Sequence, residues 1–215
     1  TPRSRSVERI AFHKHTGEAV NCCGAYIENE AGNREEIERE GLLVKFPFGT
    51  EKKTYDWWDS DLGKAVPIEY VDEEEVEGLK TYKFEQTIEP TVVGTQPVPA
   101  SVLGEDGEGN LDAELTYSNV RTLWVEPRTG VVIKRAEQQN NTIRYDGTDR
   151  VTTTAVTTVF DDETVKDNAD KYGSLGAMLF LVGTFGPILL LVLGLVLLAA
   201  VAVLTLRRRN EVATD

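Results

Sequence analysis

The chain has 215 residues, of which 36 are acidic and 23 are lysine or arginine, and its formal net charge at pH 7 is −13. Nucleic acids and anionic lipid headgroups are bound through basic surfaces, so this balance argues against a nucleic acid partner and against docking on such headgroups. The length is sufficient for one hydrophobic core or two small lobes.

A β-hairpin is predicted over residues 7–20, with Gly17 in a Thr-Gly pair at its tip. The same Thr-Gly pair returns at Gly130, again between two apolar arms. Glycine can take the positive φ that a tight turn needs, so both pairs favour a turn. The repeat indicates either a duplicated unit or a turn that this chain uses twice.

The rest of the outer part reads as short antiparallel strands, because apolar, β-branched and aromatic residues alternate with polar ones. Residues 28–41 are mixed in charge and predict a solvated loop or a short surface helix. Residues 89–110 hold three prolines and four glycines and predict a long loop. The predicted strands are 42–46, 65–71, 79–88, 111–117, 121–125, 131–135, 142–145 and 150–160.

A helix is predicted from Asp161, which can cap it, to about Lys171. An uncharged run then extends from Leu175 to Leu206. About 20 helical residues cross the roughly 30 Å core of a bilayer, so this run is long enough to span one. Pro187 removes a helical hydrogen bond and predicts a kink within the run.

The basic residues Arg207, Arg208 and Arg209 follow the run, and acidic residues precede it. Basic flanks remain on the cytoplasmic side, so the C-terminus is predicted to be cytoplasmic and the N-terminal part extracytoplasmic. The chain does not begin with methionine and shows no signal peptide, so we expect an export signal or an earlier membrane segment elsewhere.

The predicted fold is therefore mainly β, with an antiparallel β-rich extracytoplasmic domain, a short helix and one C-terminal transmembrane helix. The domain occupies residues 1–160 and is expected to be the C-terminal part of a larger outer region. A juxtamembrane helix or linker follows at 161–174, then the transmembrane helix at 175–206 and a cytoplasmic tail at 207–215. The expected location is the cell membrane, and glycines in the helix would allow a homo-oligomer to form through it.

Cys22 and Cys23 are adjacent in the sequence. Thiols outside the cell tend to be oxidised, which favours a disulfide. Three arrangements remain open: a vicinal disulfide, separate disulfides to cysteines of an upstream region, and free thiols. A redox enzyme would be expected to carry a Cys-x-x-Cys motif, so no redox chemistry is predicted at this pair.

Two groups of residues match metal sites only in part. His13 and His15 would share one face of a strand and supply half of a zinc site, but a solvated strand face is the preferred interpretation. Oxygen-bearing side chains alternate over residues 106–114 as in a calcium loop, but Leu111 stands where that loop needs glycine and Tyr117 where it needs glutamate. No metal site and no cofactor are predicted.

The candidate ligand-binding residues are the aromatic side chains Phe46, Phe48, Tyr55, Trp57 and Trp58. Core packing is the alternative interpretation for them. Neighbours on a strand face opposite ways, so one of the two tryptophans is expected to be exposed and available to a ligand. A cavity lined by these rings would favour binding, and a filled core would favour a structural role. The chain shows no nucleophile motif and no phosphate-binding glycine loop, so no enzyme and no catalytic residue are predicted.

Several longer motifs together resemble one known family of actinobacterial membrane proteins of unknown function, the porin PorA family. The resemblance extends from about Ile10 to the arginines at 207–209. It implies one membrane helix with a basic tail, an additional outer region and hydrophobic segment before this part, and no catalytic residues. The motifs are Thr16–Gly24, Lys45–Asp59, Leu62–Ala65, Gly78–Phe84 and Val125–Gly130.

The leading functional prediction is a single-pass, membrane-anchored cell-envelope protein that is not an enzyme. Its β-rich outer domain would bind a ligand or partner, such as a lipid or a wall component, or serve envelope structure. The alternative is a subunit of an oligomeric porin-like channel. One helix without a polar stripe cannot line an aqueous pore alone, so a channel would require several copies.

Overall fold

The computed structural model describes residues 7–28 and 32–212, with side chains described up to Leu204. The chain divides into two compact units, Thr1–Gly173 and Ser174–Asp215. Within the described residues, the first unit holds two antiparallel sheets and the second is helical. The mainly β fold with a long apolar C-terminal helix is therefore confirmed.

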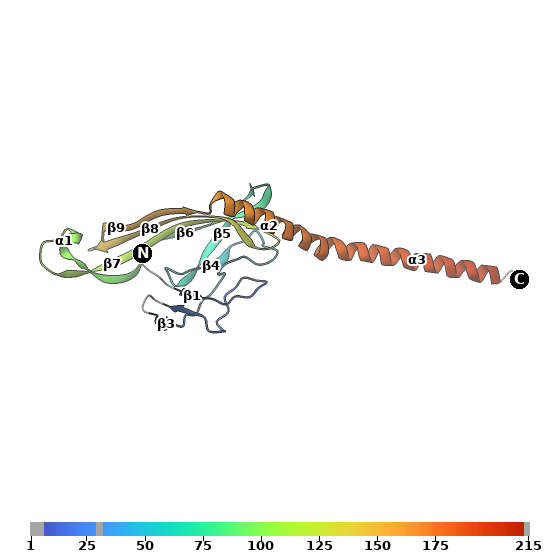
Figure 1. Cartoon of the computed structure of the whole chain (residues 1–215), viewed down its shortest axis with the longest axis horizontal. Helices are drawn as coiled ribbons and strands as arrows, with labels where there is room; N and C mark the ends of the chain where they lie inside the picture. Colours follow the sequence, from blue (N-terminus) through green and yellow to red (C-terminus); the bar gives the residue numbers. More distant parts are fainter. Residues whose placement is uncertain (1–6, 29–31, 213–215) are drawn as a thin grey trace. The chain divides into compact units, whose positions relative to one another are not determined.

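The larger sheet is an open meander of six strands, in which each strand pairs with the next along the chain (Figure 1). Such neighbours need only short connections, which suits antiparallel pairing. A smaller sheet of β1 (Val7–Arg9), β2 (Tyr26–Glu28) and β3 (Arg34–Glu35) precedes it. The six strands are β4 (Tyr55–Asp59), β5 (Lys64–Val76), β6 (Leu79–Pro99), β7 (Asn110–Glu126), β8 (Val131–Tyr145) and β9 (Thr148–Val159).

The predicted loop over residues 89–110 is largely wrong, because β6 continues to Pro99 and is followed by the short helix α1 (Ala100–Leu103). The pairing of β5 with β6 ends at Glu85, so beyond that point β6 pairs with β7 alone. The N–H groups of β6 that point away from β7 then need no partner strand. Proline, which has no N–H, is therefore tolerated at these positions of an edge strand. Pro97 and Pro99 accordingly lie opposite Asp112 and Asn110 in the β6–β7 pair.

Residues 42–46 do not form the predicted strand. Leu42 makes only isolated bridges, to Glu18 and to Trp57. Further along this segment, the backbone nitrogen of Phe46 donates to the carbonyl oxygen of Gly130 at 2.7 Å. Leu42 thus bonds to β4 at one end of the segment and Phe46 to a turn at the other, so the pairing with β4 is too short to make a strand.

Both Thr-Gly turns are present, and both contact the segment that contains Lys45 and Phe46. Gly17 and Gly130 have φ values of +78° and +71°, which favour glycine. A Cβ on Gly17 would lie 2.2 Å from the carbonyl oxygen of Lys45, and a Cβ on Gly130 would lie 2.1 Å from that of Phe46. Close backbone approach therefore requires glycine at each turn, independently of the positive φ.

One face of the large sheet is covered by residues 42–46 and the opposite face by α2 (Asp162–Phe180). Successive side chains of a strand point to opposite faces. On β7, Leu123 and Val125 pack with Leu42 and Phe46, whereas Trp124 packs with apolar side chains of α2. The side chains of α2 in this second cluster are Val165, Ala169 and Tyr172.

Helix α2 begins as predicted, because the backbone nitrogen of Thr164 donates to Oδ1 of Asp161 at 2.7 Å. It continues into the π-helical turn η1 (Leu181–Phe185) and then into α3 (Gly186–Val212). The π turn lies directly before Pro187, which has no N–H for the preceding turn. The amide of Gly186 donates five residues back, to the oxygen of Leu181.

The helix of the second unit meets the length and composition of a membrane span. Every non-glycine side chain from Leu175 to Leu204 is exposed, although most of these side chains are apolar. The side chains of Arg207, Arg208 and Arg209 lie outside the described part, so their predicted role in orientation stays a prediction.

Candidate functional site: a charged cleft on the sheet

A row of polar side chains crosses the face of the sheet that residues 42–46 cover. Gln86 of β6 lies opposite Arg121 of β7, and Arg121 lies opposite Glu137 of β8. Directly opposed side chains are neighbours on one face of a sheet. Nη1 of Arg121 donates to Oε1 of Gln86, and its Nε donates to Oε1 of Glu137. Glu137 also accepts from Nη2 of Arg135 at 2.7 Å.

Asp59 at the end of β4 completes this row. Its Oδ1 accepts from the backbone nitrogens of Asp61 at 3.1 Å and Leu62 at 3.0 Å, which fixes the turn into β5. Its Oδ2 accepts from the hydroxyl of Tyr117 at 2.9 Å and from Nη2 of Arg121 at 3.1 Å. The residue is only 1% exposed, so the turn and the sheet hold this carboxylate in one position.

Burial and the nearby Asp59 carboxylate together raise the pKa of Tyr117 well above that of a free phenol. Burial alone would lower the pKa of Arg121, but its hydrogen bond to Glu137 and the charges of Glu137 and Asp59 raise it. Burial and the charge of Asp59 also raise the pKa of the Asp61 carboxyl at the edge of this row. The side chain of Tyr117 therefore remains a neutral phenol, and that of Arg121 remains a charged guanidinium.

A cleft of about 320 Å³ opens above this row. Three acidic and three arginine side chains line it, so its formal charge is balanced. The charged lining residues are Glu8, Asp61 and Glu137, and Arg39, Arg121 and Arg135. Tyr117, Trp57 and Trp58 contribute aromatic walls.

Arg39 is the cleft residue with the least satisfied side chain. The residue is 4% exposed, and none of its three guanidinium nitrogens makes a hydrogen bond to the described part of the chain. Its described ion pair joins Nη2 to Oε2 of Glu8 at 3.6 Å, and the Glu8 side chain is itself 38% exposed. Buried polar groups are normally hydrogen-bonded, so this guanidinium is able to donate to a further acceptor.

The backbone of Arg39 is nevertheless held firmly. Its nitrogen donates to Oδ1 of Asn21 at 2.9 Å, and its oxygen accepts from Nδ2 of Asn21 at 3.0 Å. Among the described residues, Nε1 of Trp58 and Oδ1 of Asn119 are also buried near the row without a hydrogen bond. The side chain of Asn119 otherwise donates to the hydroxyl of Tyr117 at 3.2 Å.

The five candidate aromatic residues do not come together in one cavity. Phe46 and Trp57 are buried in a filled core, with ring centroids 5.3 Å apart, and Tyr55 packs against Phe46 at 5.3 Å. Phe48 is 44% exposed and lies below the ammonium group of Lys45.

The expectation that one tryptophan is exposed is wrong, because Trp57 is 5% and Trp58 8% exposed. Leu42 covers the outer edge of β4 through the hydrogen bond from the nitrogen of Trp58 to its carbonyl oxygen, and the cleft residues enclose the Trp58 side chain. An edge strand covered in this way can bury neighbouring side chains on both of its faces.

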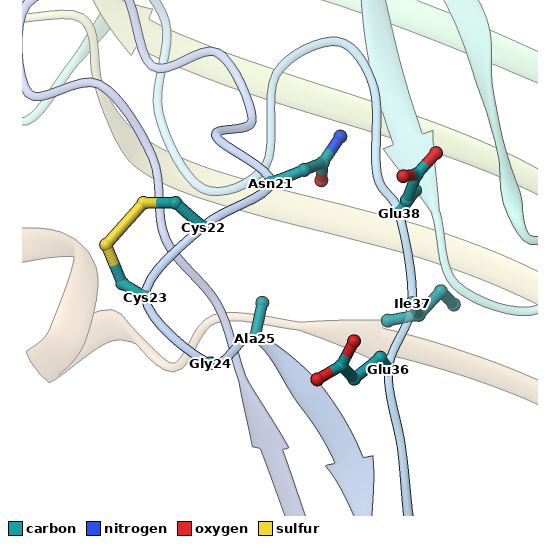
Figure 2. A pocket seen from close by; sticks show the side chains of 8 residues that line it. All are labelled: Asn21, Cys22, Cys23, Gly24, Ala25, Glu36, Ile37 and Glu38. Carbon is teal, nitrogen blue, oxygen red and sulfur yellow. A yellow bond between two sulfur atoms is a disulfide. The ribbon is translucent and has the colours of Figure 1, made fainter.

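A second hollow of about 430 Å³ lies beside Cys22 and Cys23 (Figure 2). The Sγ atoms of the two cysteines are bonded to each other, which is the first of the three arrangements considered. In Figure 2 the two sulfur atoms point away from the segment that carries Glu36 and Glu38. Glu36 and Glu38 are the charged residues of this hollow, so it offers no cationic group to a ligand.

His13 and His15 lie in the first Thr-Gly turn, with ring centroids 5.7 Å apart. The ring of His15 also packs near Phe48, at 5.6 Å. Over residues 7–28 and 32–212, no group of three or more histidine, cysteine, aspartate or glutamate side chains is placed to hold a metal ion.

Among the residues of the cleft, the sequence singles out Trp57 and Trp58 but none of the charged residues. Arg39 stands in a stretch predicted to be solvated, and nothing in its neighbourhood marks it as buried. A signal for Arg121 does exist, because Tyr117, Asn119 and Arg121 share the period-2 positions of the core residues Leu123 and Val125. Polar residues at inward positions of a strand are a sign of a buried network.

Comparison with known proteins identifies the family to which the chain belongs. A model of the family Porin PorA matches residues 4–203. The chain belongs to the Porin PorA family. A protein named Porin PorA from Corynebacterium resistens is 29% identical over 80% of this chain and 57% of its own length. Another of that name from Corynebacterium amycolatum is 30% identical over 46% of this chain and 32% of its own length.

The chain thus spans about half the length, or less, of these Porin PorA relatives. Both relatives carry the name of a porin rather than of an enzyme. The family match includes the six-stranded sheet, the residues of the cleft and most of the apolar helix. The resemblance noted in the sequence is therefore confirmed at the level of the family.

Proposed function

We propose that this protein is a single-pass, membrane-anchored cell-envelope protein whose β-rich outer domain binds a ligand without catalysis. The observation that carries the anchor is the helix from Leu175 to Leu204, whose apolar side chains are exposed on every face. A helix that is apolar all round is suited to a lipid surrounding. The cleft of balanced charge, with its unsatisfied Arg39, supports the ligand-binding role.

In this proposal residues 1–160 form the extracytoplasmic domain and residues 161–174 the juxtamembrane helix. Residues 175–206 cross the membrane and residues 207–215 form the cytoplasmic tail. The three arginines after the span favour this orientation. The bond between Cys22 and Cys23 is consistent with an oxidising location outside the membrane.

Single-cysteine labelling tests the orientation. In a background with Cys22→Ser and Cys23→Ser, Thr158→Cys places a thiol at an exposed position of β9, and Asn210→Cys places one in the tail. On intact protoplasts, a membrane-impermeant maleimide should label only the Thr158→Cys protein. The Asn210→Cys protein should react only after the membrane is disrupted. The reverse pattern would overturn the orientation.

The family favours a second candidate, a subunit of an oligomeric porin-like channel. A single span without charged residues cannot line an aqueous pore alone, so several copies would have to associate through their helices. Gly183 and Gly194 have nothing within 4 Å of a Cβ position, which leaves room for another helix.

Native mass spectrometry of the protein extracted from its own envelope in mild detergent separates the two candidates. A monomer with a bound small molecule supports the anchored ligand-binding protein. A ligand-free ring of several subunits that conducts ions in planar bilayers supports the channel. Gly194→Ile should then break up the ring, and Val192→Ile, two residues away, should leave it intact.

A further inference from the structure

We propose that the charged cleft binds a neutral, polyhydroxylated group, that is, a sugar unit, through Arg39 and Trp58. This inference rests on the proposed ligand-binding role of the outer domain and names the chemical class of the ligand. The observation behind it is that the donor groups of Arg39 and Trp58, which line the cleft, are buried without a hydrogen-bond partner among the described residues, beside the carboxylates of Glu8 and Asp61 in the same lining.

The cleft lining calls for a group that can both donate and accept. The three nitrogens of the Arg39 guanidinium and Nε1 of Trp58 can only donate, whereas the carboxylates of Glu8 and Asp61, which also line the cleft, can accept. A phosphate or a carboxylate would accept from Arg39 and Trp58 but would be repelled by these two carboxylates. A hydroxyl group has one proton to donate and two lone pairs to accept with, so a polyhydroxylated molecule matches both kinds of group.

The charge of the cleft also favours a neutral ligand. Arg121 and Arg135 already contact Glu137, and Arg121 also contacts Asp59, so their charges are compensated within the protein. Three acidic and three arginine side chains line the cleft, within a chain of net charge −13. A bound anion would add a charge that these surroundings do not balance. A neutral hydroxylated group adds none.

The size and the walls of the cleft are consistent with one sugar unit. Its volume of about 320 Å³ lies near the lower end of small-molecule sites, which run from about 300 to 1,000 Å³. Trp58 is amphipathic, and its ring can contact the apolar C–H face of a sugar while its N–H reaches a hydroxyl. The side-chain amide of Gln139 and the hydroxyl of Ser60 add further polar groups to the lining.

The test measures retention of the intact protein on an array of neutral mono- and disaccharides. The protein is kept in a polyoxyethylene detergent, because detergents with sugar headgroups would compete. Wild-type protein should bind at least one sugar, and inorganic phosphate should not displace it. Arg39→Met and Trp58→Phe should each weaken that binding by about tenfold to a hundredfold, as expected for losing buried hydrogen bonds to the ligand.

Two matched variants serve as controls. Arg144 pairs with Asp149 on the surface, and Trp124 donates to Glu74 in the cluster with α2, so neither residue belongs to the cleft. Arg144→Met and Trp124→Phe should therefore bind the sugar as the wild type does. Equal binding by all four variants would overturn the site, because retention would then come from another surface.

Two further outcomes would overturn the sugar class, and they differ in what they imply for the ligand-binding role of the domain. If inorganic phosphate binds in a manner that depends on Arg39 and no sugar does, the ligand is an anion, and the ligand-binding role of the domain survives. If neither probe binds, the ligand-binding role falls together with the sugar class. The anchoring by the helix is tested separately, by the cysteine labelling described above.

Discussion

The guanidinium of Arg121 lies 3.1 Å from the carboxylate of Asp59, although the two residues are 62 positions apart and belong to β7 and β4. Two strands, β5 and β6, lie between them in the sheet. Three strand spacings amount to about 14 Å in a flat sheet, so this contact requires the sheet to curl over its own polar face. The cleft lies inside that curl.

Asp59→Asn is expected to destabilise the outer domain by about 3 kcal/mol, because Arg121 would lose part of its buried charge compensation. Urea unfolding in detergent, followed by tryptophan fluorescence, measures this change. Asp56→Asn is the matched control at an exposed position of the same strand and should change the stability only slightly. Equal effects of the two variants would contradict a structural role for the Asp59–Arg121 contact.

The raised pKa of Tyr117 predicts a loss of stability at alkaline pH. A group with a raised pKa in the folded protein contributes stability that is complete below its unfolded pKa, near 10 for a phenol, and is lost as the pH rises above that value. Between about pH 8 and about pH 11, wild-type protein should therefore lose about 1 kcal/mol more than Tyr117→Phe does. Denaturant unfolding at the two pH values checks this, and identical losses would show that the phenol ionises freely.

Arg39→Met is expected to stabilise the ligand-free protein by about 1 to 3 kcal/mol, because it removes a buried charge that no described residue hydrogen-bonds. The thermal unfolding midpoint should rise accordingly. Arg34→Met is the control, since Arg34 is an exposed residue paired with Glu28, and its unfolding midpoint should stay close to that of the wild type. A clear loss of stability in Arg39→Met would mean that the folded protein already satisfies this guanidinium.

Gly130→Ala should destabilise the domain far more than Gly78→Ala. Both glycines have positive φ, +71° and +74°, so both substitutions incur a similar backbone strain of about 1 kcal/mol. Only the Cβ at position 130 would clash, with the carbonyl oxygens of Phe46 and Pro47. The difference between the two midpoints of urea unfolding isolates the cost of that clash, and a difference of zero would mean that the turn can move away.

The class of the fold follows from local sequence patterns, whereas the lengths of the strands do not. The alternation in β6 and β7 and the uncharged run of the helix are visible in the sequence. The predicted gap between residues 135 and 142 is a continuous part of β8, although it is strongly polar. This stretch pairs with β7 on one side and β9 on the other, and pairing on both sides satisfies its backbone whatever its side chains are.

The site is less predictable than the fold. Arg39 is buried because Asn21 and the curled sheet enclose it, and both of these contacts are distant in sequence. A charged residue within a polar stretch looks the same whether it is solvated or enclosed. The closely spaced aromatic residues between Phe46 and Trp58 favour a binding site in the sequence, but most of them pack in the filled core beside the cleft.

The two Thr-Gly turns, around Gly17 and Gly130, also constrain the order in which the chain can fold. The segment that contains Phe46 bonds to both turns, and the second turn connects β7 to β8. Closing a contact between residues 46 and 130 costs the entropy of a long loop, so we expect docking of the N-terminal segment to be a late kinetic step. Until that step, the aromatic core and the floor of the cleft would be open to water, and refolding measured by tryptophan fluorescence should lag behind the formation of β structure.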